Sequence, residues 1–419
     1  MKLSRLVLVG LVIIPVVVVM ATNPVFVSDD QGFSPTGNGT ISGETVITGT
    51  ELIVVGPDGT VEFRDTLRDE YWDVDPIPNS SEVVVSTVKY DPAGAGCSDC
   101  IRQRIERIDI STGERTVLYA ELTPGERANE WHDVDRLNET HYMIGVLSQH
   151  AVKTVDVSTD TTVWAWSGYT ALDTGDGGPF GGDWTHLNDV EVVRNGEFVA
   201  ASLRNHDTVV FINRSSGQVN ETLTLGADDE YATLAEQHNA DYIPESRGGP
   251  AMIVADSNND RIIEYAFADG EWVESWVWQD DQLKWPRDGD RLPNGHTLVT
   301  DTNGNRVLEV NTEGEVVWSI STSINVYEAE RLSTLDESAG GAAAATLGLE
   351  SRTVQPKTVE DQLQAAVDAT LGARVVNAII QVTPEWMRLT EFGAILVSVL
   401  SALALAGYRI SARGLLPSR

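Results

Sequence analysis

Cysteine is nearly absent from this sequence of 419 residues. The only two, Cys97 and Cys100, lie in a Gly-rich loop, and two thiolates do not supply the four ligands of a structural zinc site. The βαβ context of a thioredoxin-like redox motif is also missing. We therefore expect a local disulfide, which fits an oxidising compartment.

Basic residues are scarce as well, because 29 lysines and arginines stand against 63 aspartates and glutamates, for a net charge of −34. Such a surface repels phosphates, so no nucleic-acid partner is expected. The acidic residues are dispersed rather than collected in a tail, which fits a protein kept soluble in high salt better than a cation-binding protein. The composition therefore predicts a halophilic source.

Long apolar runs are confined to the two ends of the chain. Residues 6–21 follow two basic residues as in a signal sequence but lack a clear small-x-small cleavage site, so residues 1–22 are predicted to be a signal or an N-terminal membrane anchor. Residues 388–410 are predicted to form a C-terminal transmembrane helix. Positive residues at both outer ends place the termini in the cytoplasm and the intervening chain on the extracellular side of the cell membrane. Five Asn-x-Ser/Thr sequons agree with this placement.

The chain between these ends contains an internal repeat. Six copies open with a four-residue motif that closes on an acidic anchor, and the anchors follow one another at intervals of 40 to 60 residues. The anchors are Asp75, Asp135, Asp189, Asp241, Asp290 and Glu330. Runs rich in β-forming residues follow each opening and are separated by Asn-Gly, Ser-Gly or Glu-Gly turns. This pattern is typical of propeller blades, so we predict an all-β, six-bladed β-propeller over residues 41–335.

The first and last parts of this region complement each other. The last copy stops near residue 332, whereas residues 45–70 supply later strands without an opening strand. Pairing of the N-terminal strands with the C-terminal blade would close the propeller and leave no free sheet edge. Outside it we predict a flexible stalk at 23–40, a small-residue linker at 336–356 and an amphipathic helix at 357–382.

The position three residues before each anchor varies from copy to copy, and it should form a ring around one end of the central channel. In blade order these residues are Trp72, His132, His186, His238, Arg287 and Tyr327. The anchors are acidic in every copy, which indicates braces between blades. A lone histidine is most often a core residue, but three in adjacent blades indicate one shared site.

A further basic group is expected at this site. Arg204 follows His186 by eighteen residues, where the next strand should turn back toward the channel, whereas His206 could equally lie in a surface turn. Imidazoles with guanidinium groups suit a tetrahedral oxyanion such as sulfate or phosphate. The same imidazoles could bind a metal, but a metal site would need a carboxylate or a fourth histidine and gains nothing from arginine. We therefore predict an anion site without a metal or other cofactor.

Several short motifs resemble the arylsulfotransferase (aryl-sulfate sulfotransferase) family over about residues 41–332. They are Trp131-His132-Asp133, Asp183-Trp184-Thr185-His186-Leu187-Asn188, Ser202-Leu203-Arg204 and Gln237-His238. The resemblance, to a membrane-anchored member of haloarchaeal type, implies an extracytoplasmic six-bladed propeller that moves a sulfuryl group from an aryl sulfate ester to a phenolic acceptor without a nucleotide donor. It also implies that His238 becomes transiently sulfated, while His132, His186 and Arg204 hold the sulfuryl oxygens.

This assignment predicts a ping-pong mechanism, because neutral imidazole is nucleophilic near pH 7. Arg204 and a protonated His132 or His186 would stabilise the transition state, with Arg287, Trp72 and Tyr327 as candidate substrate-binding residues. Two alternatives stay open. One is a noncatalytic cell-surface propeller that binds a sulfated glycan or a protein partner, and the other is a metal-dependent oxidoreductase or hydrolase that uses the three histidines.

Overall fold

The computed structural model describes residues 35–37, 41, 43–90, 100–124, 129–322, 324–334 and 340–353. The predicted terminal segments 1–22 and 388–410, the helix at 357–382 and most of the stalk lie outside these residues. Among the helices within the described ranges, none is long and apolar enough to cross a bilayer.

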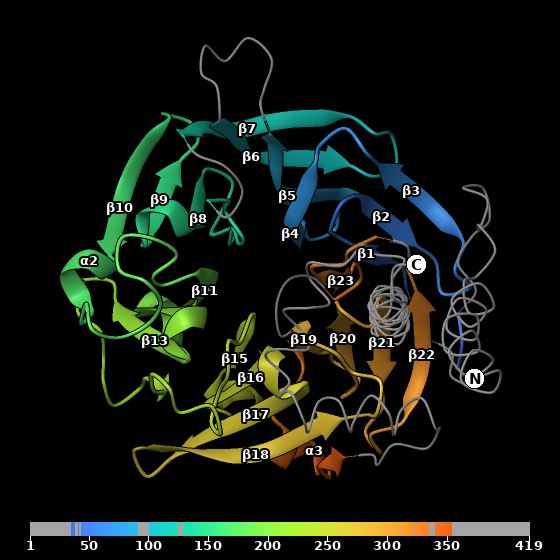
Figure 1. Cartoon of the computed structure of the whole chain (residues 1–419). Helices are drawn as coiled ribbons and strands as arrows, with labels where there is room; N and C mark the ends of the chain where they lie inside the picture. Colours follow the sequence, from blue (N-terminus) through green and yellow to red (C-terminus); the bar gives the residue numbers. More distant parts are fainter. Residues whose placement is uncertain are drawn as a thin grey trace, which may run out of the picture. The chain divides into compact units, whose positions relative to one another are not determined.

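The described strands form six sheets around one central axis, which confirms the predicted six-bladed propeller (Figure 1). Blade 1 contains β4 (Glu70–Pro76), β5 (Glu82–Tyr90), β6 (Cys100–Asp109) and β7 (Arg115–Pro124). Blade 2 contains β8 (His141–Val146), β9 (Ala151–Asp156) and β10 (Thr161–Ser167). Blade 3 contains β11 (Leu187–Val193), β12 (Phe198–Leu203), β13 (Thr208–Asn213) and β14 (Leu225–Gly226).

The second half of the ring is built in the same way. Blade 4 contains β15 (Ala240–Ile243), β16 (Ala251–Asp256), β17 (Arg261–Ala268), β18 (Glu271–Gln279) and β24 (Arg352–Thr353). Blade 5 contains β19 (Pro286–Arg291), β20 (Thr297–Asp301), β21 (Arg306–Val310) and β22 (Val316–Ser321). Blade 6 contains β23 (Ala329–Arg331), β1 (Thr45–Ile47), β2 (Leu52–Val55) and β3 (Val61–Asp65). The short helices are η1 (Leu147–Gln149), α2 (Gly168–Ala171), η2 (Arg194–Gly196), η3 (Arg204–His206), η4 (Glu245–Arg247), η5 (Ser257–Asn259) and α3 (Ala344–Leu347).

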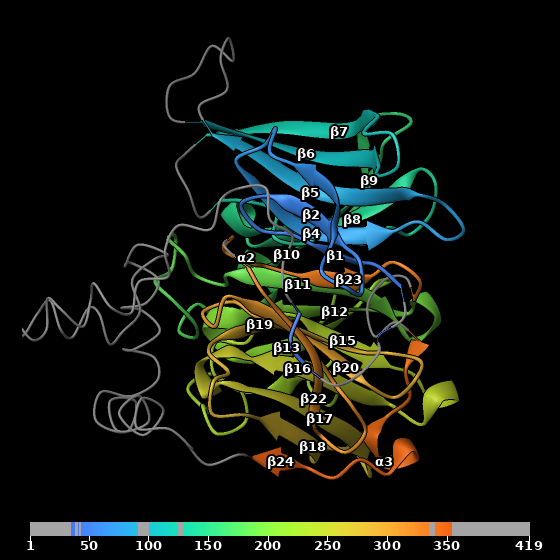
Figure 2. The ribbon, with the colours of Figure 1, turned by 90° about the vertical axis from the view of Figure 1, so that its right-hand side faces the viewer.

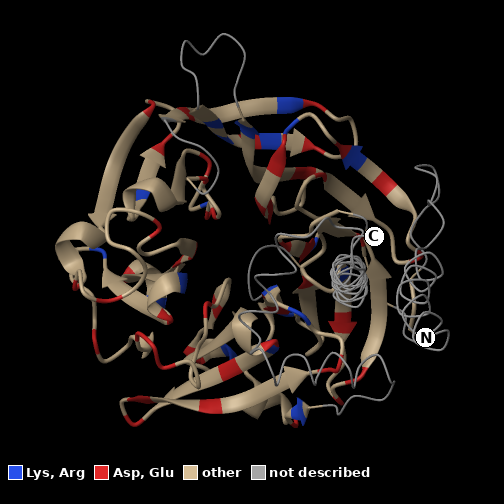
Figure 3. Ribbon diagram, viewed as in Figure 1, with Lys and Arg blue, Asp and Glu red and all other residues tan. Residues whose placement is uncertain are grey.

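Each pair of neighbouring blades shares one apolar cluster, so that six clusters run around the described propeller. Sheets that are covered on both faces need no alternation of polar and apolar residues. The middle strands β12 and β16 are accordingly buried at every position. Acidic residues are spread over all parts of the ring (Figure 3).

Strands from the two ends of the described chain meet in blade 6. There β23 pairs antiparallel with β1, with Glu330 opposite Val46. Beyond the strands, Tyr327 N donates to Thr48 O at 2.9 Å and Thr48 N donates to Glu328 O at 2.9 Å. These bonds also hold the backbone of Tyr327, one of the predicted site residues.

Inner carboxylates tie blade 1 to blade 2 and blade 2 to blade 3, as expected for braces. Asp75 Oδ2 accepts from Arg136 N at 2.8 Å, and Asp135 Oδ2 accepts from Val192 N at 3.1 Å. These two anchors are therefore confirmed as braces.

The third copy departs from the predicted alignment. The residue that corresponds to Asp135 is Glu191, whose Oε2 accepts from Tyr242 N at 2.7 Å, while the predicted anchor Asp189 also contacts blade 4, through a hydrogen bond from the backbone of Ala240. Both residues are acidic and lie two positions apart on the same face of a strand, so the sequence pattern does not distinguish them. In this register Asn188, and not His186, matches His132, while His186 lies just ahead of β11 beside a β-bulge.

Residues 340–353, which fall in the predicted linker, pack against the propeller. Ala343 and Ala344 are buried in the cluster between blades 4 and 5, and Ala344 N donates to the Glu264 carboxylate at 2.9 Å. β24 then pairs in parallel with β18, and the side view shows both segments beside that strand (Figure 2). This part of the predicted linker is ordered because alanine side chains fit the space between the two blades.

The cysteine loop is described only in part. Cys100 opens β6 and is disulfide-bonded, whereas Cys97 lies outside the described residues. Since the chain has only two cysteines, this agrees with the expected local disulfide.

Candidate active site

The six predicted ring residues meet at the N-terminal ends of the inner strands, and we call them the central cluster. They are Trp72, His132, His186, His238, Arg287 and Tyr327. The ring centroids of Trp72 and His132 are 4.6 Å apart, and those of Trp72 and Tyr327 are 4.8 Å apart. His132 lies 5.3 Å from His186. The cluster is therefore continuous, although its members come from six different blades.

His238 lies just before β15, and its side chain is only 1% exposed. Its Nδ1 lies 2.8 Å from Ser257 Oγ, at the start of η5. Its imidazole packs edge-on against Trp285 with centroids 4.9 Å apart, and the centroid of Tyr327 lies 6.3 Å away. One ring nitrogen thus faces the protein, which leaves Nε2 for a ligand.

His132 is held by the neighbouring blade. Its Nδ1 lies 3.1 Å from Asn188 Oδ1, while Asn188 Nδ2 donates to Gln237 O at 3.0 Å. Because the amide nitrogen is already used as the donor, the amide oxygen accepts from His132 Nδ1–H. The lone pair of His132 is therefore on Nε2.

His186 is held by two charged groups. Its Nδ1 lies 2.8 Å from the Asp183 carboxylate, and Arg204 Nη1 lies 3.2 Å from its Nε2. Arg204, at the start of η3, also lies 3.6 Å from Asp183. Carboxylate, imidazole and guanidinium thus fix one another, and the predicted association of Arg204 with the histidines is present in the structure.

Arg287 is the second guanidinium of the site. Its guanidinium carbon lies 4.5 Å from the Tyr327 ring centroid and 4.8 Å from that of Trp285, distances at which cation–π attraction is effective. Desolvation lowers the pKa of Arg287 to about 10, so this side chain is still a cation at pH 7.

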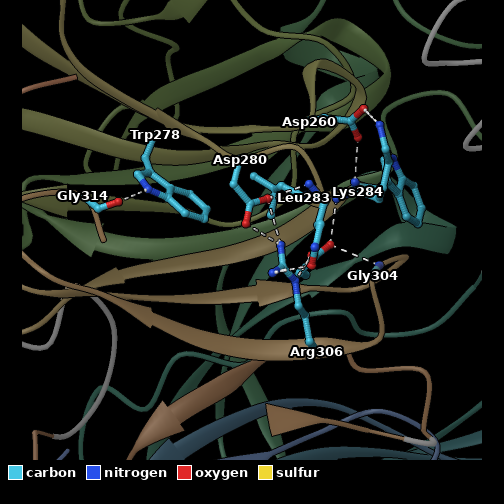
Figure 4. Close-up of polar contacts among 11 residues, drawn as sticks. Asp260, Trp278, Asp280, Leu283, Lys284, Gly304, Arg306 and Gly314 are labelled. Carbon is cyan, nitrogen blue, oxygen red and sulfur yellow. Dashed lines mark hydrogen bonds and ion pairs between the residues drawn. The ribbon is translucent and has the colours of Figure 1, made fainter. Parts of the chain in front are cut away.

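Polar contacts between blades 4 and 5 fix the segment that leads into β19. Asp260 Oδ1 accepts from Trp285 N at 2.8 Å, and Asp301 accepts from Lys284 N at 2.8 Å and from Arg306 Nε at 2.6 Å. Figure 4 shows this network, in which Lys284 points toward Asp260. These buried contacts thereby position the segment that carries Trp285, the aromatic side chain beside His238.

Several hydrogen-bond donors around the cluster are buried and lack a partner within the described part of the chain. They are Trp72 Nε1, Trp285 Nε1, Arg287 Nε and the Tyr327 hydroxyl. Buried polar groups are usually satisfied, so unsatisfied donors indicate a place for an acceptor. An oxyanion, which offers only acceptor oxygens, matches this set.

Burial lowers the pKa of all three histidines. In His186, burial and the Arg204 charge bring the pKa to about 4 in spite of the hydrogen bond to Asp183. The pKa values of His132 and His238 lie well below the ordinary range, first through burial and then through the neighbouring His186 for His132 and through Arg287 and Arg204 for His238. All three are neutral near pH 7, so the expected imidazolium charge is absent at rest and the arginines carry the positive charge.

Buried carboxyl groups lie on the same inner strands. Burial, reinforced by the carboxylate of Asp133, raises the pKa of Asp189 well above its usual range, and burial raises the pKa of Asp288 to about 7. A raised pKa favours the protonated, uncharged form, so these two groups repel a bound anion less than ordinary carboxylates would.

A metal site would need several ligand atoms close enough together to share one ion. Over the described ranges, two groups of carboxylates lie close enough together to share an ion, namely Asp207 with Asp228 and Asp229, and Asp241 with Asp288 and Asp290. Neither group includes a histidine. Within the described ranges, the ligand atoms of the three histidines are thus not gathered closely enough to form such a group, which does not favour a shared histidine metal site.

Sequence reasoning did not assign roles to four residues of this site. Asp183 and Asn188 belong to motifs that it singled out, but Ser257 and Trp285 reach the histidines from other turns and carry no sequence signal. His206 is buried against Trp184 rather than at the surface, with ring centroids 5.5 Å apart.

No curated protein matches the chain. Among solved structures, it is similar to a protein of unknown function from Bacteroides caccae, at 11% identity over 69% of this chain and 98% of that chain, with a TM-score of 0.49. It is also similar to a periplasmic gluconolactonase from Pseudomonas aeruginosa, at 12% identity over 69% of this chain and 98% of that chain, with a TM-score of 0.45. A virginiamycin B lyase from Staphylococcus aureus matches at 10% identity over 70% of this chain and 84% of that chain, with a TM-score of 0.42.

One family model matches the chain, over residues 16–264, and it describes the arylsulfotransferases (ASST). The matched region is more than half of the 419 residues. It includes Trp72, the three histidines and Arg204, and it ends before Arg287 and Tyr327. The chain therefore belongs to the arylsulfotransferase family.

Proposed function

We propose that the chain transfers a sulfuryl group from an aryl sulfate ester to a phenolic acceptor through a covalent sulfohistidine at His238. Family membership supports a sulfotransferase, and the observation that carries the finer assignment is the set of buried, unpartnered donors around a neutral histidine. Arginine and unpartnered donors surround His238, whose Nδ1 is occupied by Ser257. A neutral imidazole with a free Nε2 is a nucleophile.

In the first half-reaction, His238 Nε2 attacks the sulfur of the ester. An N–S bond forms, the bond between sulfur and the aryl oxygen breaks, and the phenolate leaves with the bonding electrons and then takes a proton from water. Arg204 and Arg287 stabilise the negative charge on the sulfuryl oxygens, because guanidinium donors are fixed before the charge develops.

In the second half-reaction, the hydroxyl oxygen of the acceptor phenol attacks the sulfur. Its proton passes to His132 Nε2, whose lone pair is free because Nδ1 donates to Asn188. A base of low pKa in a buried site accepts this proton as the oxygen becomes positive in the transition state. The N–S electrons return to His238, and the aryl sulfate product leaves.

The first test is intact-protein mass spectrometry after mixing the full chain with p-nitrophenyl sulfate and no acceptor. We expect an adduct of about 80 Da, the mass of SO3, together with one equivalent of nitrophenol, and neither in His238→Asn. The matched control is His141→Asn, because His141 bonds to Thr140 in a turn outside the cluster. Binding of the ester without an adduct or nitrophenol would instead identify a noncatalytic sulfate-binding propeller.

We also propose that residues 1–22 and 388–410 anchor the chain in the cell membrane with the propeller on the extracellular side. Their apolar composition, the flanking basic residues and the disulfide of Cys100 support this placement, since disulfides persist in oxidising compartments. Protease added to intact cells should then remove the propeller. Resistance until the cells are lysed would contradict the proposal.

A further inference from the structure

The side chain that contacts His238 is a neutral hydroxyl in a fully buried position. Ser257 is 0% exposed, and its Oγ lies 2.8 Å from His238 Nδ1. The same oxygen lies 2.7 Å from Pro286 O, the carbonyl just before Arg287. Ser257 therefore connects the candidate nucleophile in blade 4 to the inner strand of blade 5.

The direction of these two hydrogen bonds follows from the number of protons available. A serine hydroxyl has one proton, and a carbonyl oxygen can only accept. At 2.7 Å, two oxygens with no hydrogen between them would repel each other, so the hydroxyl proton lies toward Pro286 O. Toward His238 the Ser257 oxygen is then an acceptor, and the imidazole proton must be on Nδ1.

We propose that Ser257 is a positioning residue that holds His238 as the Nδ1–H tautomer and thereby makes Nε2 the nucleophilic atom. This inference rests on the proposed sulfohistidine mechanism. Ser257 itself does not contact substrate in that mechanism. It acts through the orientation and proton position of the histidine.

The three histidines of the cluster support a specific role for a neutral partner at this position. His186 faces the Asp183 carboxylate and His132 faces the Asn188 amide oxygen, so each Nδ1 has an acceptor, but only His186 has a charged one. A carboxylate stabilises an imidazolium and can accept its proton, whereas a serine hydroxyl does neither strongly.

This difference matters for the covalent intermediate. When neutral His238 attacks through Nε2, the ring keeps its Nδ1 proton and becomes an N-sulfonated imidazolium. Ser257 cannot take that proton, because its oxygen is a very weak base. The ring therefore stays cationic, and the N–S bond breaks readily when the acceptor attacks, since a neutral imidazole is the leaving group.

The tautomer can be read directly, without relying on activity. In the full chain labelled with 15N-histidine, the two nitrogen shifts of each ring distinguish Nδ1–H from Nε2–H, and His238→Asn identifies the His238 signals among seven histidines. We expect a protonated Nδ1 and an unprotonated Nε2 in the wild type. A protonated Nε2 would overturn the inference irrespective of any Ser257 variant.

Substitution at Ser257 then tests the functional consequence. In Ser257→Ala the Nδ1–H loses its acceptor, and we expect the His238 signals to show a mixture of tautomers and the nitrophenol burst to slow by about 10- to 100-fold, as for other residues that orient a reactive imidazole. KM for the ester should stay within a factor of two. Ser257→Thr keeps the hydroxyl and should restore most of the rate.

The outcomes separate this inference from the proposed function. A wild type that forms the adduct, with Ser257→Ala equally fast, overturns only the role of Ser257. A wild type without adduct overturns the sulfohistidine mechanism and the inference with it. A uniform loss of melting temperature and burst amplitude in both Ser257 variants, with a wild-type Nδ1–H signal in the folded fraction, would assign Ser257 a packing role and overturn the inference.

Discussion

The two sides of the central cluster differ in how their polar groups are used. In blades 2 to 4, the Nδ1 atoms of His132, His186 and His238 all contact protein oxygens. Around blades 5, 6 and 1, Arg287 Nε, the Tyr327 hydroxyl and Trp72 Nε1 are buried without a partner among the residues described. One side is oriented by the protein itself, and the other is left to be satisfied by a ligand.

This difference indicates that one side of the cluster carries the reacting groups and the other side recognises the substrate. Groups that react must hold one tautomer and one orientation, which hydrogen bonds from neighbouring blades provide. Groups that recognise a substrate must keep their donors unused until it binds.

After the loss of the nucleophile His238 itself, the largest expected effect would come from Arg204, the cation on the histidine side. In Arg204→Lys the contact with His186 and the ion pair with Asp183 cannot both form, and paired donors for the sulfuryl oxygens are lost. We expect the nitrophenol burst rate to fall by about 100- to 1000-fold, the range for loss of one transition-state donor. Arg214→Lys, at a residue whose guanidinium bonds to Gly196 O away from the cluster, should leave the rate unchanged.

Arg287 tests the opposite side of the comparison. Lysine there keeps the charge but loses the planar Nε–H, so we expect KM for the aryl sulfate to rise by about 10- to 100-fold with a smaller change in kcat, the cost of one charged hydrogen bond. Steady-state kinetics measures KM and kcat, with Arg194→Lys as the control. A fall in kcat with KM unchanged would place Arg287 with the catalytic groups. It would contradict the distinction between reacting groups on one side and substrate-recognising groups on the other.

A smaller effect is expected at Trp72, where phenylalanine keeps an aromatic ring beside His132 and Tyr327 but removes the indole N–H. The loss of one neutral donor should raise KM by about 2- to 10-fold. Trp272→Phe is a matched control, because its indole donates to Leu223 O far from the cluster. An unchanged KM in Trp72→Phe would assign this residue to packing alone.

The smallest expected effect is on stability against pH. Because the pKa of His186 is about 4 in the folded chain and 6.5 is its ordinary value, the unfolded chain binds more protons between these two values. The free energy of unfolding should therefore fall as the pH drops from 6.5 to 4, and the melting temperature should fall with it. His186→Asn should make this decline shallower, whereas an equally steep decline would contradict burial of a neutral His186.

Much of the fold could be predicted because the repeat is written in short, local patterns. An acidic residue that closes each motif, followed by β-forming runs and glycine turns, is enough to predict six blades, and the anchors Asp75 and Asp135 are braces as expected. The alignment was shifted by two residues in the third blade, where Asp189 and Glu191 both bridge to the next blade and only their contacts with Ala240 and Tyr242 show which of them matches Asp135.

The composition of the candidate site was also readable, since three histidines in successive copies and Arg204 at a fixed interval converge in space. The protonation states of these histidines could not be predicted. The sequence leads to an expected imidazolium at His132 or His186, but burial makes both neutral, and burial depends on how six blades close around them.

The sequence alone therefore determined which residue types come together, because a repeat places corresponding segments of successive copies, to within the two-residue shift at His186, around one axis. Only the tertiary structure decided how each is used. Ser257 and Trp285 reach His238 from turns that are distant along the chain, and no local pattern encodes a contact that forms between blades. Tautomer, charge and unused donors arise from those contacts, for the physical reason that they depend on neighbours in space rather than in sequence.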